Sequence, residues 1–217
     1  MIKRLQRHNF QWEDEPLETL LDKYCKWDEQ RQDYVGCKNA LYWWCNANQS
    51  SQFCIKHNKY LKEFMIENPP AFKISDECCL WAKKKIAHGM VKNGEYGLNI
   101  YGVRKAERGV RAVAYKNCFD ENQGCDNYRP IFFYSDQDKE DYENHYNITH
   151  SKCYTEYGLK QTGCAGCPFG RDFETELDIM RQYEPKLYQA ANNIFRDSYD
   201  YTRRYRLFCK EKELENK

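Results

Sequence analysis

Apolar residues recur along the first third of the chain at spacings that favour helices. In residues 16–34 they return every three or four positions on one stripe, which predicts an amphipathic helix with Pro16 in its first turn. Residues 38–45 are too apolar and aromatic for an exposed surface, so they predict a buried helix or turn. Residues 56–67 predict a further helix, which the Asn-Pro-Pro sequence at 68–70 would end.

The middle of the chain combines one helix with two short strands. Residues 75–77, Ser-Asp-Glu, are typical of a helix cap and predict a helix over residues 78–88, with two adjacent cysteines in its first turn. Residues 97–102 and 130–134 are short apolar runs bounded by residues that break regular structure. Both predict buried strands.

Two more helices are indicated by their first residues. Ser135 is suited to cap an acidic helix over residues 136–146, and Pro185 is suited to open a long helix over residues 186–208. Helix therefore outweighs strand, and the few strands have the continuous apolar character of buried ones. This combination predicts a helix-rich α/β layer rather than an all-α or all-β domain.

The charge balance narrows the classes of partner. Across 217 residues, 34 Lys and Arg side chains face 33 Asp and Glu side chains, which leaves a net charge of +1. A general electrostatic attraction to nucleic acid or anionic lipid is therefore not expected. The sequence has no run of about 18 apolar residues, so a membrane-spanning helix is not expected either.

The cysteines are too numerous to ignore. A count of 12 first suggests a secreted disulfide framework. However, the first residues, Met-Ile-Lys-Arg-Leu-Gln-Arg-His, lack the apolar run of a signal peptide, and a chain of this length does not need disulfides in place of a core. We therefore expect a reducing, cytoplasmic environment in which some of the thiols serve metal or redox chemistry.

Four of the cysteines can supply thiolates to one site. They are the adjacent pair Cys78 and Cys79 and the C-x-x-C pair Cys164 and Cys167. Glycines at 163 and 166 would permit close backbone approach around the second pair. Four thiolates suit a tetrahedral zinc ion or an iron–sulfur cluster, and adjacent cysteines fit a cluster more easily because successive side chains diverge. The alternative is a pair of buried helix residues and a separate redox dithiol.

Basic residues follow the first predicted strand. Arg104, Arg108 and Arg111 lie at a strand exit, where open α/β sheets bind ligands, and guanidinium groups bind phosphate or sulfate in a bidentate manner. Lys83 begins a run of three lysines after the Cys-Cys pair, which would bind an anion, offset thiolate charge or form a solvated face. Glu107 is expected to orient an arginine rather than act as a base, because a carboxylate among cations stays ionised.

Four further cysteines have spacings that fit no standard zinc pattern: Cys25, Cys37, Cys45 and Cys54. We expect them to be small core residues, with a second metal site as the alternative.

Several short motifs, taken in order, resemble the phosphoadenosine phosphosulfate reductase family, particularly its iron–sulfur members and its relatives encoded by phages or mobile elements. The resemblance covers about residues 72–170. The motifs are Cys78-Cys79-x-x-x-Lys83, Gly102-x-Arg104-x-x-Glu107-x-x-x-Arg111, Arg129-Pro130 before an apolar run, and Tyr157-Gly158 followed by Thr162-Gly163-Cys164-x-x-Cys167.

The resemblance implies both a fold and a site. The fold would be the adenine-nucleotide α-hydrolase-like layer of the PP-loop superfamily. Residues that match Cys78, Cys79, Cys164 and Cys167 would ligate a 4Fe–4S cluster, with zinc as the alternative. Residues that match Lys83, Arg104 and Arg111 would lie near the anionic end of a bound sulfonucleotide.

The departures from the family define two functional hypotheses. The chain contains no Ser-Gly-Gly-x-Asp-Ser loop, so the layer is expected to be truncated at its N-terminus, and Cys209 does not match the family's nucleophilic cysteine motif. One hypothesis is sulfonucleotide reduction or sulfur transfer, with the nucleotide-binding half supplied by another chain. The other is a non-catalytic module that binds or inhibits a protein partner, or a second copy of itself. The expected organisation is a helical segment at 1–70, the reductase-like core at 71–170 and a helical segment at 171–217.

Overall fold

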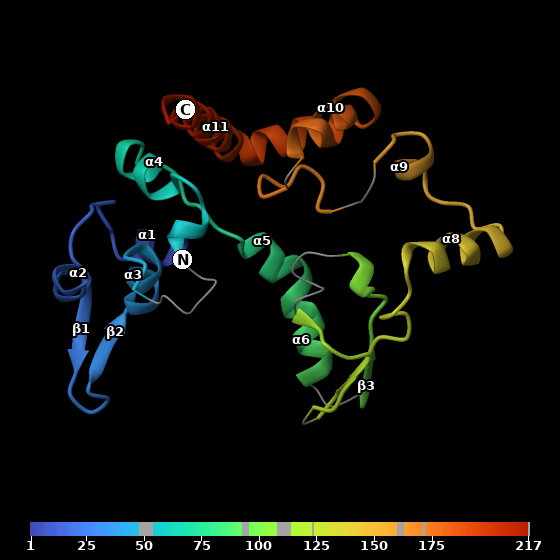
Figure 1. Ribbon diagram of the computed structural model, residues 1–217, viewed down its shortest axis with the longest axis horizontal. Helices are drawn as coiled ribbons and strands as arrows, with labels where there is room; N and C mark the ends of the chain where they lie inside the picture. Colours follow the sequence, from blue (N-terminus) through green and yellow to red (C-terminus); the bar gives the residue numbers. More distant parts are fainter. Residues whose placement is uncertain are drawn as a thin grey trace. The chain divides into compact units, whose positions relative to one another are not determined.

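The described part of the chain has an α/β structure with about 54% helix and two small sheets (Figure 1). It divides into two compact units: unit 1 comprises residues 1–75 and 157–217, and unit 2 comprises residues 76–156. The computed structural model describes residues 1–47, 54–92, 96–107, 114–122, 124–159, 163–170 and 172–216.

Unit 1 is built mainly from helices and carries one β-hairpin. Its N-terminal part contains α1 (Ile2–Arg7), α2 (Leu17–Tyr24), β1 (Cys25–Asp28), β2 (Asp33–Gly36), α3 (Lys38–Trp44), the 3-10 turn η1 (Ile55–His57) and α4 (Leu61–Glu67). Its C-terminal part is a pair of helices that pack against each other, α10 (Phe173–Tyr183) and α11 (Pro185–Glu215).

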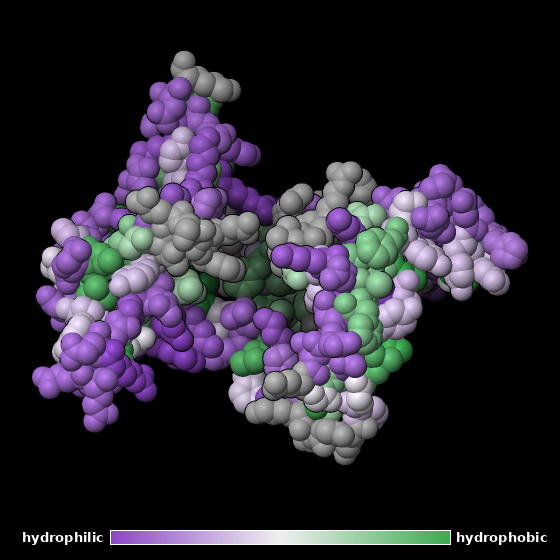
Figure 2. Space-filling model, turned by 60° about the horizontal axis from the view of Figure 1, so that its bottom comes forward, coloured by the Kyte–Doolittle hydropathy of each residue, from purple (hydrophilic) through white to green (hydrophobic). Residues whose placement is uncertain are grey.

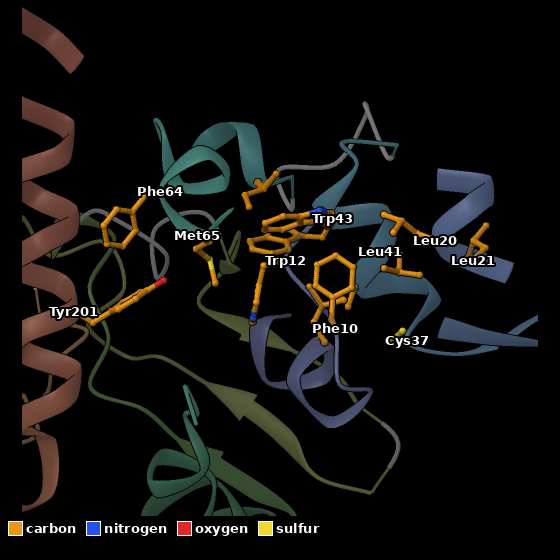
Figure 3. Close-up of a cluster of buried hydrophobic side chains, with 14 residues drawn as sticks. Phe10, Trp12, Leu20, Leu21, Cys37, Leu41, Trp43, Phe64, Met65 and Tyr201 are labelled. Atoms are coloured by element: carbon orange, nitrogen blue, oxygen red, sulfur yellow. The ribbon is translucent and has the colours of Figure 1, made fainter. Parts of the chain in front are cut away.

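The larger core of unit 1 is aromatic. The Trp44 side chain is fully buried, and its ring lies edge-on to Phe10 and Trp12, with centroids 5.4 and 5.7 Å away. Tyr201 reaches this cluster from α11 and packs edge-on against Phe64 of α4, with centroids 5.0 Å apart (Figure 3). Aromatic side chains bury large apolar areas and favour such edge-to-face contacts, so this cluster joins α11 to the N-terminal part of the unit.

The helix predicted over residues 16–34 is correct only in its first half. It ends at Tyr24, and the chain then forms the antiparallel hairpin β1–β2. The Asp28 carboxylate accepts hydrogen bonds from the backbone N–H groups of Gln30 and Arg31, at 3.0 and 3.1 Å. This local side-chain turn competes with the helix for the same backbone groups, which explains the hairpin.

The other predictions for unit 1 are largely confirmed. Helix α3 is buried as expected for residues 38–45. The segment predicted at 56–67 forms η1 and α4, and α4 ends before Asn68 as predicted. Pro185 opens α11, which continues past the predicted end at residue 208.

Unit 2 contains a helical rod and a three-stranded sheet. The rod consists of α5 (Glu77–Cys79), a π-helical turn η2 (Leu80–Lys84) and α6 (Lys85–Lys92), which follow one another without a gap and confirm the helix predicted at 78–88. The sheet has the order β3-β5-β4, from β3 (Leu98–Ile100), β4 (Phe119–Asp120) and β5 (Asp126–Tyr128). Strand β3 runs parallel to β5, and β4 runs antiparallel to it.

The strand predicted at 97–102 is present, but its predicted burial is wrong. Residues 97–102 include strand β3, but its apolar side chains are not buried: Leu98 is 46% exposed and Ile100 is 61% exposed. Apolar residues of this unit also reach its surface in the hydropathy view (Figure 2).

The strand predicted at 130–134 is wrong. The chain turns there, because the Phe132 N–H donates to the Arg129 carbonyl at 3.1 Å and Pro130 has no N–H for a sheet ladder.

In the described part of unit 2, the 3-10 turn η3 (Lys105–Glu107) lies between β3 and β4, and the helices α8 (Asp136–His145) and α9 (Lys152–Thr155) follow β5. Ser135 caps α8 as predicted, in a reciprocal capping box with Asp138. None of the helices in the described part of the chain is both long enough and apolar enough to cross a membrane.

Candidate functional site

The C-x-x-C pair lies on a tight turn in unit 1. The Cys167 N–H donates to the Cys164 carbonyl at 3.1 Å, and the Gly170 N–H then donates to the Cys167 carbonyl at 2.9 Å. Cys164 is exposed and Cys167 is partly exposed, and both are free thiols. The turn therefore presents two thiols close together in sequence and accessible to a ligand.

Gly166 fixes this turn against the helical pair. Its φ is +65°, a left-handed conformation that glycine adopts without strain. A Cβ atom at this position would lie 2.7 Å from the Ala191 Cβ and 2.8 Å from the Tyr199 hydroxyl. The close approach that the sequence predicted is thus confirmed at Gly166. A Cβ on the second predicted glycine, Gly163, would meet no atom within 4 Å.

Tyr199 of α11 holds the turn in place. This role was not predicted from the sequence. Its side chain is fully buried, its hydroxyl donates to the Gly166 carbonyl, and its ring stacks on Phe173 with centroids 5.2 Å apart. Burial, and then the nearby Cys167 thiol, raise the pKa of Tyr199 to about 12, so the hydroxyl remains a donor at neutral pH. The contact joins residues 33 positions apart, which no local pattern reveals.

The Cys-Cys pair belongs to unit 2. Both residues lie in α5, the first turn of the helical rod, as predicted; Cys78 is exposed and Cys79 is partly exposed. The four predicted ligands are thus divided between the two units, and their assembly into one site stays a prediction. Within either unit, the residues that the structure describes contain no group of three or more His, Cys, Asp or Glu side chains placed to hold a metal ion.

Arg104 lies after β3, where the anion-binding residues were predicted. Its Nη1 donates to the Ser135 carbonyl at 2.8 Å and to the Asp136 carboxylate at 3.0 Å, and its side chain is only 13% exposed. The Glu107 carboxylate accepts a hydrogen bond from the Arg104 backbone N–H at 3.3 Å. Arg104 therefore joins the exit of β3 to the start of α8.

The other predicted anion-binding side chains lie outside the residues that the structure describes. Arg111 lies outside the described residues, as does the side chain of Lys83, whose backbone belongs to the π-helical turn. The anion pocket that would combine them with Arg104 stays a prediction.

Arg129, which the sequence analysis named only as part of a motif, is a buried charge in unit 2. Its side chain is 2% exposed, and its Nη2 lies 2.5 Å from the Asp120 carboxylate. Its Nη1 donates to the Asn117 carbonyl at 2.9 Å, and its guanidinium lies 4.1 Å from the centroid of the Tyr115 ring. A buried arginine needs such partners, so Arg129 holds β4 and the chain before it against the end of β5.

Taken by themselves, the described residues offer two pairs of accessible thiols, of which the Cys164–Cys167 pair has the better defined support. Thiols on a rigid turn are suited to soft metals, to clusters or to thiol–disulfide exchange. Comparison with known proteins adds no further constraint: no family model matches the chain, and neither does any curated protein or solved structure.

Proposed function

We propose that the chain is an iron–sulfur protein of the phosphoadenosine phosphosulfate reductase type, whose cluster is held by Cys78, Cys79, Cys164 and Cys167. The observation that carries the proposal is the turn of Cys164 and Cys167, which Gly166 and the buried hydroxyl of Tyr199 hold in one conformation. A ligand pair that is already ordered loses less conformational entropy on binding.

The donor set fits a cluster. All four side chains are free thiols, and each is at least partly accessible. Iron–sulfur clusters are bound by cysteine thiolates, and a bound cluster supplies electron transfer or polarises a bound ligand. In unit 1, the Tyr199 hydroxyl donates to the Gly166 carbonyl and keeps the turn in place.

The substrate in this proposal is a sulfonucleotide whose anionic end lies near Arg104. The two side-chain hydrogen bonds that Arg104 makes to the described residues both use Nη1, and in this proposal its other guanidinium nitrogens bind a sulfate or phosphate oxygen. The 217 residues contain no glycine-rich loop of the family type, so we propose that the part that cradles the phosphates lies outside them.

A second candidate function is a non-catalytic module with a structural cluster or zinc ion that binds a protein partner. The pairing of Arg104 with Asp136 favours it, because an incoming anion would be repelled by that carboxylate.

Metal analysis of anaerobically purified protein tests the centre. We expect about four irons and four sulfides per chain with broad visible absorption, and loss of both in Cys164→Ser and Cys78→Ser. Cys153→Ser is the matched control, because Cys153 is also a partly exposed free thiol but is outside the predicted set, and it should retain the cluster. About one zinc without sulfide would support the structural module, and no metal in the protein would overturn both versions.

Calorimetry tests whether the isolated chain binds the nucleotide without a second part. In the absence of a phosphate-cradling loop, we expect no micromolar binding of phosphoadenosine phosphosulfate or adenosine phosphosulfate to the isolated chain. Micromolar binding that is lost in Arg104→Gln would show that the chain binds the nucleotide by itself and would refute the need for a second part.

A further inference from the structure

A second pair of neighbouring thiols lies in unit 1. Its two cysteines are not among the four predicted cluster ligands. The Sγ atoms of Cys25 and Cys37 are 3.8 Å apart. Cys25 is the first residue of β1 and is partly exposed, whereas Cys37 is fully buried in the aromatic core. The Cys37 thiol also contacts the Tyr24 carbonyl at 3.6 Å, which holds it beside the start of the hairpin.

The backbone of the hairpin produces this approach. Cys25 pairs with Gly36 in the antiparallel register, so Cys37 is the first residue beyond the ladder. Gly36 has a φ of +118°, which other residues rarely adopt, and it lets the chain turn directly into α3, where Cys37 is the N-terminal cap. The turn brings the Cys37 side chain back beside Cys25 instead of letting it follow the strand.

We propose that Cys25 and Cys37 form a reversible intramolecular disulfide, a redox site distinct from the C-x-x-C turn. A disulfide bond is about 2.0 Å long, so the two sulfurs need to approach each other by about 1.8 Å. The oxidant in this proposal is a small disulfide of the glutathione class.

The exchange proceeds in two balanced steps. Cys25 Sγ attacks one sulfur of glutathione disulfide, so that a mixed disulfide forms, the glutathione S–S bond breaks and one glutathione leaves with the Cys25 proton. Cys37 Sγ then attacks the Cys25 sulfur, so that the internal bond forms and the second glutathione leaves with the Cys37 proton. Two protein thiols are oxidised, and one glutathione disulfide is reduced to two glutathione molecules.

The order of the steps follows from the environments of the two thiols. Burial, and then the neighbouring Cys25 thiol, raise the pKa of Cys37 to about 12, so Cys37 stays protonated and shielded at neutral pH. The partly exposed Cys25 is therefore the thiol that meets the oxidant. Cys37 reacts only as the internal partner, where its proximity replaces high reactivity.

Peptide mapping of the full chain equilibrated in glutathione buffers tests the proposal directly. Trypsin cleaves after Lys23, Lys26, Arg31 and Lys38, so the disulfide would join peptide 24–26 to peptide 32–38, each of which carries one cysteine. We expect this cross-linked pair to reach half-oxidation at a ratio of glutathione disulfide to glutathione roughly tenfold lower than the ratio that modifies Cys45. Cys45 is the matched reference, because burial also raises the pKa of its thiol.

The single variants give opposite results if the two roles are correct. In Cys37→Ser, Cys25 should accumulate as a stable mixed disulfide with glutathione; in Cys25→Ser, Cys37 should stay unmodified. Wild-type protein that carries glutathione separately on both cysteines, or that leaves both reduced when Cys45 is modified, would overturn the proposal. The wild-type measurement stands by itself if either variant fails to fold.

Discussion

The substitution Gly166→Ala tests whether the C-x-x-C turn is held by its contacts with α10 and α11. The added Cβ would lie 2.7 Å from the Ala191 Cβ and 2.8 Å from the Tyr199 hydroxyl. Neither neighbour is the far end of a flexible side chain, because Ala191 is part of α11 and the Tyr199 ring is stacked on Phe173. The turn or the helix has to move.

The expected loss has two parts. A residue with a Cβ in the left-handed region costs roughly 1–2 kcal/mol. Overpacking of a close contact costs roughly 1–3 kcal/mol more. If the turn withdraws instead, the buried hydroxyl of Tyr199 loses its acceptor, at a similar cost of roughly 1–3 kcal/mol. We therefore expect Gly166→Ala to lower the free energy of unfolding by about 2–5 kcal/mol.

Urea denaturation followed by tryptophan fluorescence measures this loss, since Trp44 is buried in the core of the same unit. The matched control is Gly158→Ala. Gly158 also belongs to unit 1 and has a φ of +72°, but a Cβ there meets nothing within 4 Å. The control should show only the backbone part, about 1–2 kcal/mol.

Equal losses in the two variants would refute the reasoning, because the close contacts at Gly166 would then cost nothing. The double variant Gly166→Ala with Ala191→Gly adds a second check. Removal of the Ala191 Cβ costs about 1 kcal/mol in a helix by itself, yet it should recover part of the loss in the Gly166→Ala background.

Two further predictions concern tyrosine ionisation and the strand exit. Burial raises the pKa values of Tyr199 and Tyr201 to about 12, from an ordinary value of 10.0. Their contribution to stability is therefore complete below pH 10 and is lost as the pH rises through about 12, so circular dichroism should show unfolding together with tyrosinate absorption in that window. Arg104→Gln should lower the free energy of unfolding by about 1 kcal/mol, because it removes the contacts to the Ser135 carbonyl and to Asp136. Asp136→Asn should change it by less than about 0.5 kcal/mol in the same urea assay, because that carboxylate is 77% exposed and the Ser135 contact remains; a larger loss in Asp136→Asn than in Arg104→Gln would contradict this account.

Sequence reasoning succeeded where a structure depends on neighbouring residues. Ser135 caps α8 through the backbone three positions later, and Pro185 opens α11 because its ring fits a first helical turn. The C-x-x-C turn is similarly local, since its hydrogen bond joins Cys167 to Cys164. In each case the interacting groups lie within one turn of each other.

It failed where two local preferences compete or where partners are distant. Residues 25–28 continue the helical stripe of the preceding segment, but the Asp28 turn and the pairing of β1 with β2 prevail. Residues 130–134 have the composition of a strand, yet they form a turn, and Phe132 is buried within that turn. The contact between Cys25 and Cys37 could not be predicted from the helical pattern, because a continuous helix would hold residues 12 positions apart far from each other. The hairpin brings them together.

Helix α11 links the stability of the N-terminal core to the order of the thiol turn. Tyr199 and Tyr201 are two residues apart, so their side chains leave the helix in roughly opposite directions. Tyr201 packs on Phe64 and donates to the Asn68 carbonyl at 2.8 Å, whereas Tyr199 donates to Gly166. A helix held on one face by the core presents its other face in a fixed position, so the turn that bears Cys164 and Cys167 is ordered only while α11 is docked. Any ligand that binds these thiols in the ordered turn must then stabilise the docked helix as well, because the two equilibria share α11.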